Sequence, residues 1–216
     1  EDQMKNQPLV TIITVCKNSE TTIGRTIESI KRQSWKNIQY IVVDGESTDR
    51  TREIVEANNN VVDLLISEKD SGIYYAMNKG LKLANGSIIG ILNSDDWYED
   101  DAVENSVTNI MRNDVDMSFG RMAIWRGTNL VRISDPSLPD SPYTSVIHSV
   151  HPTVFVRKTA YEKYGMFNTK YKIAADRDLI VRFLVAGAKI GKTDSLIANF
   201  SLQGASKGYN GWESID

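Results

Sequence analysis

The chain has 216 residues, of which 41% are hydrophobic, so it is long enough to form one domain with a full core. Its formal net charge of -3 at pH 7 excludes the strongly basic surface typical of proteins that bind nucleic acid. The single cysteine, Cys16, excludes an internal disulfide, and no cysteine–histidine cluster has zinc spacing. The chain shows no signal-peptide segment and no apolar run near the roughly 20 residues of a membrane span, so we expect a soluble, cytoplasmic protein.

Strands and helices alternate along the first half of the chain. Short apolar runs predict strands at residues 10–15, 39–44, 62–67 and 87–93. Between them, apolar residues at helical spacing predict helices, the first capped by Ser19 and the clearest running from Ile73 to Ala84. A further helix is expected at 102–113. This alternation predicts an α/β fold with a mostly parallel sheet and helices on both faces.

The pattern changes after about residue 116. We expect a hairpin formed by residues 117–124 and 129–133, a proline-containing loop at 135–142, and a strand at 153–157. Helices are predicted at 159–164 and 176–186, followed by a strand at 196–202. We expect one domain over residues 1–216, in which residues 116–206 complete a site at one edge of the sheet. Residues 207–216 form a tail in which Tyr209 and Trp212 are candidate acceptor contacts.

Acidic residues follow three of the predicted strands. Asp44 ends the second strand, Asp70 follows the third, and Asp95 and Asp96 follow the fourth. Since the carboxyl ends of parallel strands meet at one edge, and open α/β sheets bind ligands there, these side chains are expected to converge on one cleft. A divalent cation that carries a phosphorylated ligand would offset the cost of burying them. The alternative is that each aspartate caps the helix after it.

The chain lacks the glycine-rich phosphate loop of dinucleotide-binding and P-loop enzymes, because residues 15–19 (VCKNS) contain no glycine. Phosphate would therefore be held by a metal at Asp95 and Asp96. A later aspartate, Asp176, stands at the start of a predicted helix, either as its cap or as a general base. His151, one of two histidines, is either structural or a ligand of the acceptor.

Five segments resemble motifs of the family-two glycosyltransferases, in the form found in bacterial polysaccharide assembly. They occur in the order expected for that family: PLVTIITV at 8–15, VDGESTD at 43–49, DSGIYYAMNKG at 70–80, LNSDD at 92–96 and ADRDL at 175–179. The resemblance covers residues 8 to 206, with residues 8–115 as the nucleotide-sugar half. It implies an A-type glycosyltransferase fold and inversion at the anomeric carbon.

The resemblance also implies a role for each matching residue. The donor nucleotide, most simply a UDP-sugar, would be bound by the residues Val15, Asn18, Asp44, Asp70, Lys79 and Asp95. Asp96 would hold Mn²⁺ or Mg²⁺, and Asp176 would be the catalytic base. Candidate acceptor contacts are His151, Asp178 and Trp97. The acceptor would be a saccharide or a lipid-linked saccharide, which implies transient association with the inner face of the membrane.

The chain departs from the family pattern in several places. Relatives often have arginine at the position of Met77, and here the nearest cation is Lys79. Relatives often have glutamate at the position of Ala175, just before Asp176. This leaves the choice between Asp176 and Asp178 as the base open, although their spacing of two on a helix prevents both from serving one site. Two other functions stay open: a nucleotidyltransferase and a non-catalytic module that binds nucleotide or carbohydrate.

Overall fold

The computed structural model describes residues 7–135, 137 and 151–202. The predicted tail at 207–216, with Tyr209 and Trp212, and most of the predicted loop at 135–142 lie outside the described residues. The strands are β1 (Val10–Cys16), β2 (Ile38–Asp44), β3 (Leu64–Ser67), β4 (Ile88–Ile91), β5 (Trp97–Tyr98), β6 (Met117–Arg126), β7 (Asn129–Ser134), β8 (Phe155–Arg157) and β9 (Ile190–Ser201). The helices are α1 (Ile23–Lys31), α2 (Thr51–Glu56), α3 (Ile73–Leu83), α4 (Ala102–Asn113), α5 (Lys158–Tyr164) and α6 (Ala175–Val185).

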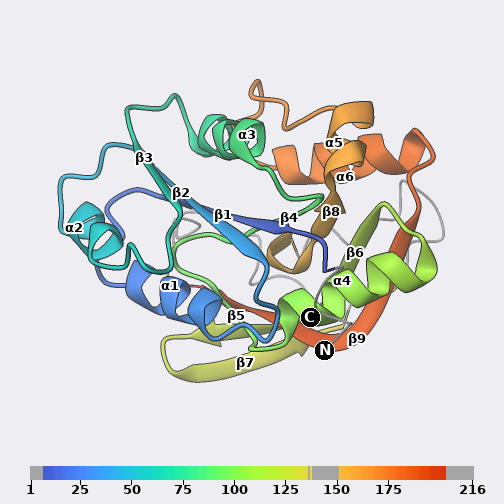
Figure 1. The fold of residues 1–216 in the computed structure, drawn as a ribbon, viewed down its shortest axis with the longest axis horizontal. Coiled ribbons are helices and arrows are strands. Elements are labelled where there is room, and N and C mark those ends of the chain that lie inside the picture. The colour runs from blue at the N-terminus through green and yellow to red at the C-terminus, as the bar shows by residue number, and fades with distance from the viewer. Residues whose placement is uncertain (1–6, 136, 138–150, 203–216) are drawn as a thin grey trace.

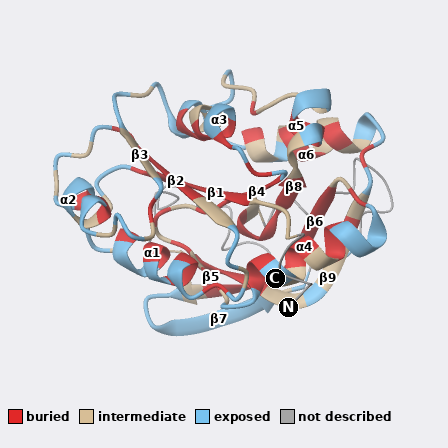
Figure 2. Ribbon diagram, in the orientation of Figure 1, coloured by how far each residue is buried: buried red, intermediate tan, exposed pale blue. Residues whose placement is uncertain are grey.

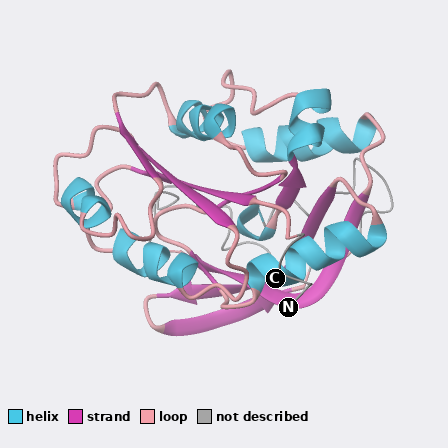
Figure 3. Ribbon diagram, in the orientation of Figure 1, coloured by secondary structure: helices cyan, strands magenta, loops and turns pink. Residues whose placement is uncertain are grey.

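One sheet runs through both halves of the chain, in the order β3-β2-β1-β4-β8-β6-β9-β5, with β7 paired to β6 (Figures 1 and 3). The first four strands are parallel, as the alternation of strands and helices predicts. In the second half, β8 pairs antiparallel with both β4 and β6, β7 pairs antiparallel with β6, and β5 pairs antiparallel with β9. Only β6 and β9 are parallel there, so the sheet as a whole is mixed.

Helices cover both faces of the sheet (Figure 1). Helices α3, α5 and α6 lie on one face, and α1, α2 and α4 lie on the other. Strand β1 shows why: Ile13 and Val15 pack into the first layer, whereas Val10 and Ile12 pack into the second. The central strands are therefore buried on both sides, as Figure 2 shows, and this explains their continuous apolar sequences.

The structure corrects several expected boundaries. Strand β9 begins at Ile190, six residues before the expected start, and the short strand β5 was not predicted. Residues 151–153, of which Thr153 was expected to start a strand, form a 3₁₀ turn before β8. The predicted cap at Ser19 is wrong, because Thr22 is the N-cap of α1 and the Ser19 hydroxyl contacts Ser94 instead.

Candidate active site

The carboxyl ends of the first parallel strands lie side by side. The Gly45 N–H, just after β2, donates to the carbonyl oxygen of Cys16 at the end of β1 (2.9 Å). The hydroxyls of Ser19 and Ser94, after β1 and β4, form a hydrogen bond of 2.8 Å. The segments that follow these strands therefore meet at one edge of the sheet, where the sequence places most of its candidate site residues.

Asp44 is buried at the end of β2, and protein groups occupy both of its carboxylate oxygens. Its Oδ2 accepts from the backbone N–H of Ser47 (3.0 Å) and from the Ser67 hydroxyl (2.7 Å). Its Oδ1 accepts from the Ser47 hydroxyl and, at 3.7 Å, from the Cys16 thiol. Asp44 therefore holds the turn after β2 against both neighbouring strands.

Val15 and Asn18 stand at the end of β1 and just beyond it. Val15 is buried in the sheet, whereas Asn18 is exposed and has a positive φ of 50°. The Asn18 Oδ1 accepts from the Thr48 N–H (2.9 Å), and the Asn18 N–H donates to the Ser47 hydroxyl (2.8 Å). These bonds fix the loop after β1 to the loop after β2.

Asp70 and Lys79 lie on the β3 side of the same edge. The Asp70 Oδ1 accepts from the Gly72 N–H (2.9 Å), and its Oδ2 faces Gly45, where an added Cβ would lie 2.8 Å from it. A glycine at 45 is therefore needed for the Asp70 carboxylate to approach the end of β2. Lys79 forms an ion pair with Glu68 (2.6 Å), so its ammonium is held close to this loop.

Asp96 is fully buried in the turn after β4, and only one of its carboxylate oxygens has a partner among the described residues. Its Oδ1 accepts from the Ser201 N–H at the end of β9 (2.9 Å), while its Oδ2 has none. The side-chain oxygen of Asn93 is also buried without a partner. Burial raises the pKa of Asp96 well above its usual range, and the nearby Asp95 charge raises it further.

These oxygens fit a divalent metal ion, because an unpaired carboxylate oxygen and an unpaired amide oxygen are the ligands that Mg²⁺ and Mn²⁺ prefer. Within the described ranges, no group of three or more histidine, cysteine, aspartate or glutamate side chains could hold a metal alone. Any metal here would therefore need further ligands from the substrate or solvent. Asp95 and Asp96 do not cap the helix that follows them, because the N-cap of α4 is a later residue, Asp101.

Arg25, on α1, covers the acidic turn, which is the turn after β4 that contains Asp95 and Asp96. The Arg25 Nη2 donates to the carbonyl oxygen of Asp95 (2.8 Å), and the guanidinium lies 3.5 Å from the centroid of the Trp97 ring. Its charge favours the ionised forms of Asp95 and Asp96 and so opposes the rise in their pKa values that burial causes. One face of Trp97, a candidate acceptor contact, is therefore occupied by Arg25.

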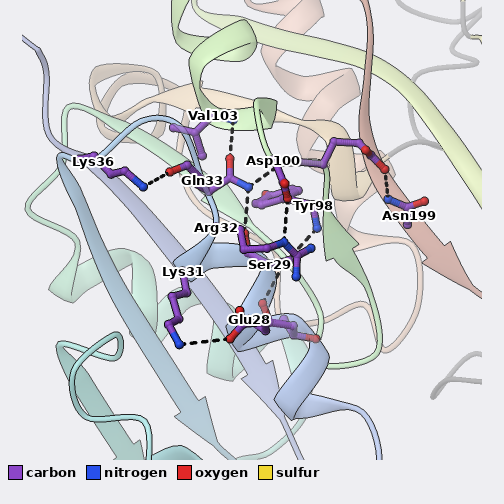
Figure 4. Close-up of polar contacts among 12 residues, drawn as sticks. Glu28, Ser29, Lys31, Arg32, Gln33, Lys36, Tyr98, Asp100, Val103 and Asn199 are labelled. Carbon is purple, nitrogen blue, oxygen red and sulfur yellow. Dashed lines mark hydrogen bonds and ion pairs between the residues drawn. The ribbon is translucent and has the colours of Figure 1, made fainter.

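Gln33 anchors the segment that follows the acidic turn, as Figure 4 shows. Its buried amide nitrogen donates to the carbonyl oxygens of Ser29 (3.0 Å) and Glu99 (2.7 Å), and its amide oxygen accepts from the Val103 N–H (3.1 Å). The Ser29 hydroxyl in turn accepts from the Tyr98 N–H (3.2 Å). These bonds tie α1 to β5 and α4, so they fix the chain immediately after Asp95 and Asp96.

Asp176 lies in the first turn of α6 and faces α3. The Tyr74 hydroxyl donates to the Asp176 Oδ1 at 3.4 Å, across 102 positions of sequence. Burial raises the pKa of Tyr74 to about 12, and the Asp176 carboxylate contributes to this rise. The tyrosine therefore keeps its proton at physiological pH and can act as a neutral donor to the carboxylate.

His151 belongs to the same cluster. Its ring meets Phe167 edge to face (5.9 Å between centroids), and Phe167 stacks on Tyr74 (5.6 Å). Burial lowers the pKa of His151, although the Asp176 charge opposes this, so the imidazole is held mainly neutral. Asn78 fixes Phe167 by donating to its carbonyl oxygen (2.8 Å) and accepting from its N–H (3.0 Å). The structure therefore brings together Asp176 and His151, which the sequence nominated separately.

Asp178 is engaged elsewhere. Its Oδ2 pairs with the Arg182 Nε at 2.8 Å, one turn further along α6. The remaining guanidinium nitrogens of Arg182 donate to the carbonyl oxygens of Tyr164 and Met166 (2.8 Å each). Asp178 thus connects α6 to the end of α5, which leaves Asp176 as the carboxylate that faces the aromatic cluster.

Sequence reasoning assigned no role to Tyr74, Phe167, Arg25 or Ser201. Tyr74 lies within the motif at residues 70–80, so its position was available, but its partner Asp176 is remote in sequence. Ser201 contributes through its backbone N–H, for which the sequence gives no signal.

Residues 11–165 match the model of the family described as glycosyl transferase family 2, and the chain belongs to this family. The Escherichia coli protein named UDP-Glc:alpha-D-GlcNAc-diphosphoundecaprenol beta-1,3-glucosyltransferase WfgD is 32% identical over 124 residues, which are 57% of this chain and 49% of WfgD. A PGL/p-HBAD biosynthesis glycosyltransferase of Mycobacterium bovis is 30% identical over 180 residues, 81% of this chain and 69% of that protein.

Solved structures share the A-type fold. Staphylococcus aureus TarS 1-349 in complex with UDP has a TM-score of 0.77 at 22% identity, over 89% of this chain and 60% of that one. The mannosyltransferase PcManGT from Pyrobaculum calidifontis, in complex with GDP-Man and Mn²⁺, has a TM-score of 0.71 at 21% identity, over 96% and 60% of the two chains. The chain thus spans about half of WfgD and 60% of these structures. Across the described residues, no helix has the length and apolar character needed to cross a membrane.

Proposed function

We propose that this chain is the catalytic region of an inverting glycosyltransferase that moves a sugar from a UDP-sugar to a saccharide or lipid-linked acceptor in surface polysaccharide or glycolipid biosynthesis. One observation carries the proposal. Asp176 faces a cluster of Tyr74, His151 and Phe167, while the competing carboxylate of Asp178 is bound to Arg182. The site therefore offers one carboxylate positioned for proton transfer from an acceptor hydroxyl.

In this proposal the donor lies at the strand ends. The backbone at Val15, together with Asn18 and Asp70, contacts the nucleotide, and Asp95 contacts the ribose or the sugar. Asp44 shapes the same wall through Ser47, because its own oxygens are occupied. Lys79 lies close enough to the loop to exchange its partner Glu68 for phosphate.

Asp96 is the proposed metal ligand, supported by its unpartnered and buried Oδ2. Mn²⁺ or Mg²⁺ bound there would neutralise the negative charge that develops on the leaving nucleoside diphosphate. Asp176 accepts the proton of the attacking acceptor hydroxyl, a role that typically contributes about 10²–10⁴-fold to the rate. Tyr74 donates to the Asp176 Oδ1 and so keeps the other carboxylate oxygen directed to the acceptor.

The acceptor is proposed to be lipid-linked, since the relative WfgD is named as a glucosyltransferase that acts on alpha-D-GlcNAc-diphosphoundecaprenol. An enzyme that uses such an acceptor works at the inner face of the membrane, where this chain would bind peripherally. Of the acceptor contacts predicted from the sequence, the proposal retains His151, which lies in the cluster with Asp176. Asp178 is paired with Arg182, and one face of Trp97 is covered by Arg25, so neither is assigned a contact with the acceptor.

A thermal-shift panel tests the donor side. UDP, GDP, CDP and dTDP would each be added with Mn²⁺, with Mg²⁺ or with EDTA, because a ligand that binds only the folded state raises the melting temperature. We expect a rise with UDP that requires metal and is lost with EDTA. UDP-glucose and UDP-N-acetylglucosamine would then be tested for metal-dependent transfer and for inversion of the anomeric configuration.

Activity assays separate the two other functions. A nucleotidyltransferase would release pyrophosphate from a nucleoside triphosphate and a sugar phosphate. A non-catalytic module would bind UDP but would show no turnover with any sugar donor, even in the wild type. Either result would overturn the proposed transfer reaction.

A further inference from the structure

A pocket of about 220 Å³ opens beside the aromatic cluster. The first turn of α3 forms one wall and the segment before α6 forms the other, and the lining residues are Ser71, Gly72, Ile73, Tyr74, Tyr75, Thr169, Tyr171 and Lys172. Its volume suits a single sugar ring and is too small for a nucleotide sugar. Of these residues, only Gly72 and Tyr74 belong to the site described above.

Tyr74 connects the pocket to the candidate base. Its ring forms part of the pocket wall, and its hydroxyl donates to the Asp176 Oδ1 at 3.4 Å. A sugar ring held in the pocket would therefore lie on one side of Tyr74, with the Asp176 carboxylate at the tyrosine hydroxyl. The attacking hydroxyl of an acceptor must reach the base, so the reacting end of the saccharide would extend from the pocket past Tyr74 to Asp176.

The walls match the chemistry of a glycosylated diphospholipid. Tyr75 and Tyr171 are 45% and 48% exposed, so their rings are available to pack against the apolar face of a sugar. Lys172 is exposed and forms no ion pair with another described residue, so its ammonium is available to a phosphate. Ile73, which lines the pocket, and Ile173, which follows Lys172 in the chain, are 38% and 60% exposed and offer apolar surface to a ligand.

We propose that this pocket is the acceptor subsite, and that it binds the sugar and diphosphate of a lipid-linked saccharide; this rests on the proposed glycosyl transfer. The sugar ring packs between Tyr75 and Tyr171, and the diphosphate contacts Lys172. The beginning of the lipid chain lies along Ile73 and Ile173. The hydroxyl groups of Ser71 and Thr169 are the hydrogen-bond partners that select the sugar.

The test uses a soluble probe, the N-acetylglucosaminyl diphosphate ester of octanol, titrated calorimetrically against the whole chain. The variants are Tyr171→Ala and Lys172→Gln, both at exposed positions, so the fold is retained. Lys170→Gln is the matched control, because Lys170 is exposed in the same segment but does not line the pocket. We expect each pocket variant to bind the probe about tenfold more weakly and the control to bind it like the wild type. The Kd for UDP with Mn²⁺ should stay unchanged in all three.

The outcomes separate this assignment from the proposed function. If both pocket variants bind the probe like the wild type, or if the wild type binds none, the subsite is wrong, even where transfer to other acceptors is observed. If the pocket variants lose UDP, the pocket belongs to the donor. If the wild type binds the probe and UDP, and the pocket variants weaken only the probe, the subsite stands. If that wild type then fails to transfer sugar, the proposed transfer reaction is wrong and the assignment of the subsite is unaffected.

Discussion

The Tyr74 hydroxyl lies 3.4 Å from the Asp176 Oδ1, and this bond joins the first turn of α3 to the first turn of α6. It connects the half of the chain assigned to the donor with the half assigned to the acceptor. Tyr74 is itself held by stacking on Phe167, whose backbone is fixed by Asn78. The orientation of the candidate base therefore depends on α3, a helix on the donor side.

Asp176→Asn should abolish sugar transfer while donor binding is retained. The amide keeps the size of the carboxylate but cannot accept a proton, so kcat should fall by about 10²–10⁴-fold. The matched control is Asp178→Asn, which should keep transfer and lose about 1 kcal/mol of stability, since it removes only the bond to Arg182. Initial rates at saturating donor, with Kd for UDP, measure both. Normal turnover in Asp176→Asn would eliminate it as the base.

Asp96→Asn should remove the metal dependence of donor binding. The variant replaces a buried carboxylate, whose pKa is raised by burial, with a neutral amide of the same shape. Without metal the folded protein should be equally stable or more stable at neutral pH, because a buried charge is costly. With Mn²⁺ and UDP, however, its melting temperature should no longer rise. Asp101→Asn, an exposed neighbour, should respond to the metal like the wild type. An unchanged Mn²⁺ response in Asp96→Asn would refute its role as a ligand.

Gln33→Ala should destabilise the protein by about 3 kcal/mol, because it leaves buried backbone groups without partners. It should also weaken the Mn²⁺-dependent binding of UDP, since Gln33 fixes the segment after the acidic turn. Arg32→Gln, at the neighbouring C-cap of α1, is the comparison. It removes only an exposed ion pair with Asp100 and should cost less than about 1 kcal/mol. Urea unfolding of both variants measures the difference, and equal losses would contradict the role given to Gln33.

Gly80→Ala and Gly24→Ala should have opposite effects, although both glycines are inside helices. A Cβ at Gly80 would lie 2.5 Å from the Ile13 side chain, so α3 would be pushed from the sheet at a cost of about 1–3 kcal/mol. A Cβ at Gly24 meets nothing within 4 Å, so alanine there should stabilise α1 by up to about 1 kcal/mol. Thermal unfolding of the two variants checks the sign; destabilisation by both would show that α1 is packed more closely than described.

His151→Gln should flatten the dependence of stability on pH in mildly acidic solution. Burial lowers the folded-state pKa of His151 below its ordinary value of 6.5, so the unfolded chain binds the proton more strongly. The contribution to stability is therefore complete above pH 6.5 and is lost as the pH falls from there through the folded-state pKa. Unfolding free energies at about pH 7.5 and about pH 5 should converge in the variant relative to the wild type. Parallel pH curves for the two proteins would rule out a buried, neutral imidazole.

The first half of the fold was predictable because each element carries its own signal. The strands β1, β2 and β4 are continuous apolar runs, and α3 shows a clear helical period. In contrast, β5 has two residues and is defined only by its partner β9. The first part of β9, around Lys192–Ser195, is polar, and it is a strand only because β6 lies beside it. Pairing over a long sequence separation overrides local propensity there.

The sequence nominated Asp95 and Asp96 because they follow a buried strand, and Asp176 because it stands at the start of a helix; their roles stay predictions. Contacts that depend on packing were not predictable. Neither the stacking of Tyr74 on Phe167 nor the position of Arg25 over Trp97 has a sequence signal. Asp44 shows the converse: its place at a strand end was clear, but the saturation of both its oxygens required the positions of Ser47 and Ser67.

The bond between Asp96 and Ser201 has a consequence for recombining relatives of this chain. The donor of that bond is a backbone N–H, so every residue except proline supplies it at position 201. This bond thus depends on the path of β9, which places the backbone N–H of residue 201 beside Asp96. Chimaeras that keep residues up to the end of α4 and take the later strands from a different family member should therefore preserve the acidic turn, provided that the imported strand ends in the same register. Acceptor preference could then be exchanged between relatives without rebuilding the residues that hold the donor.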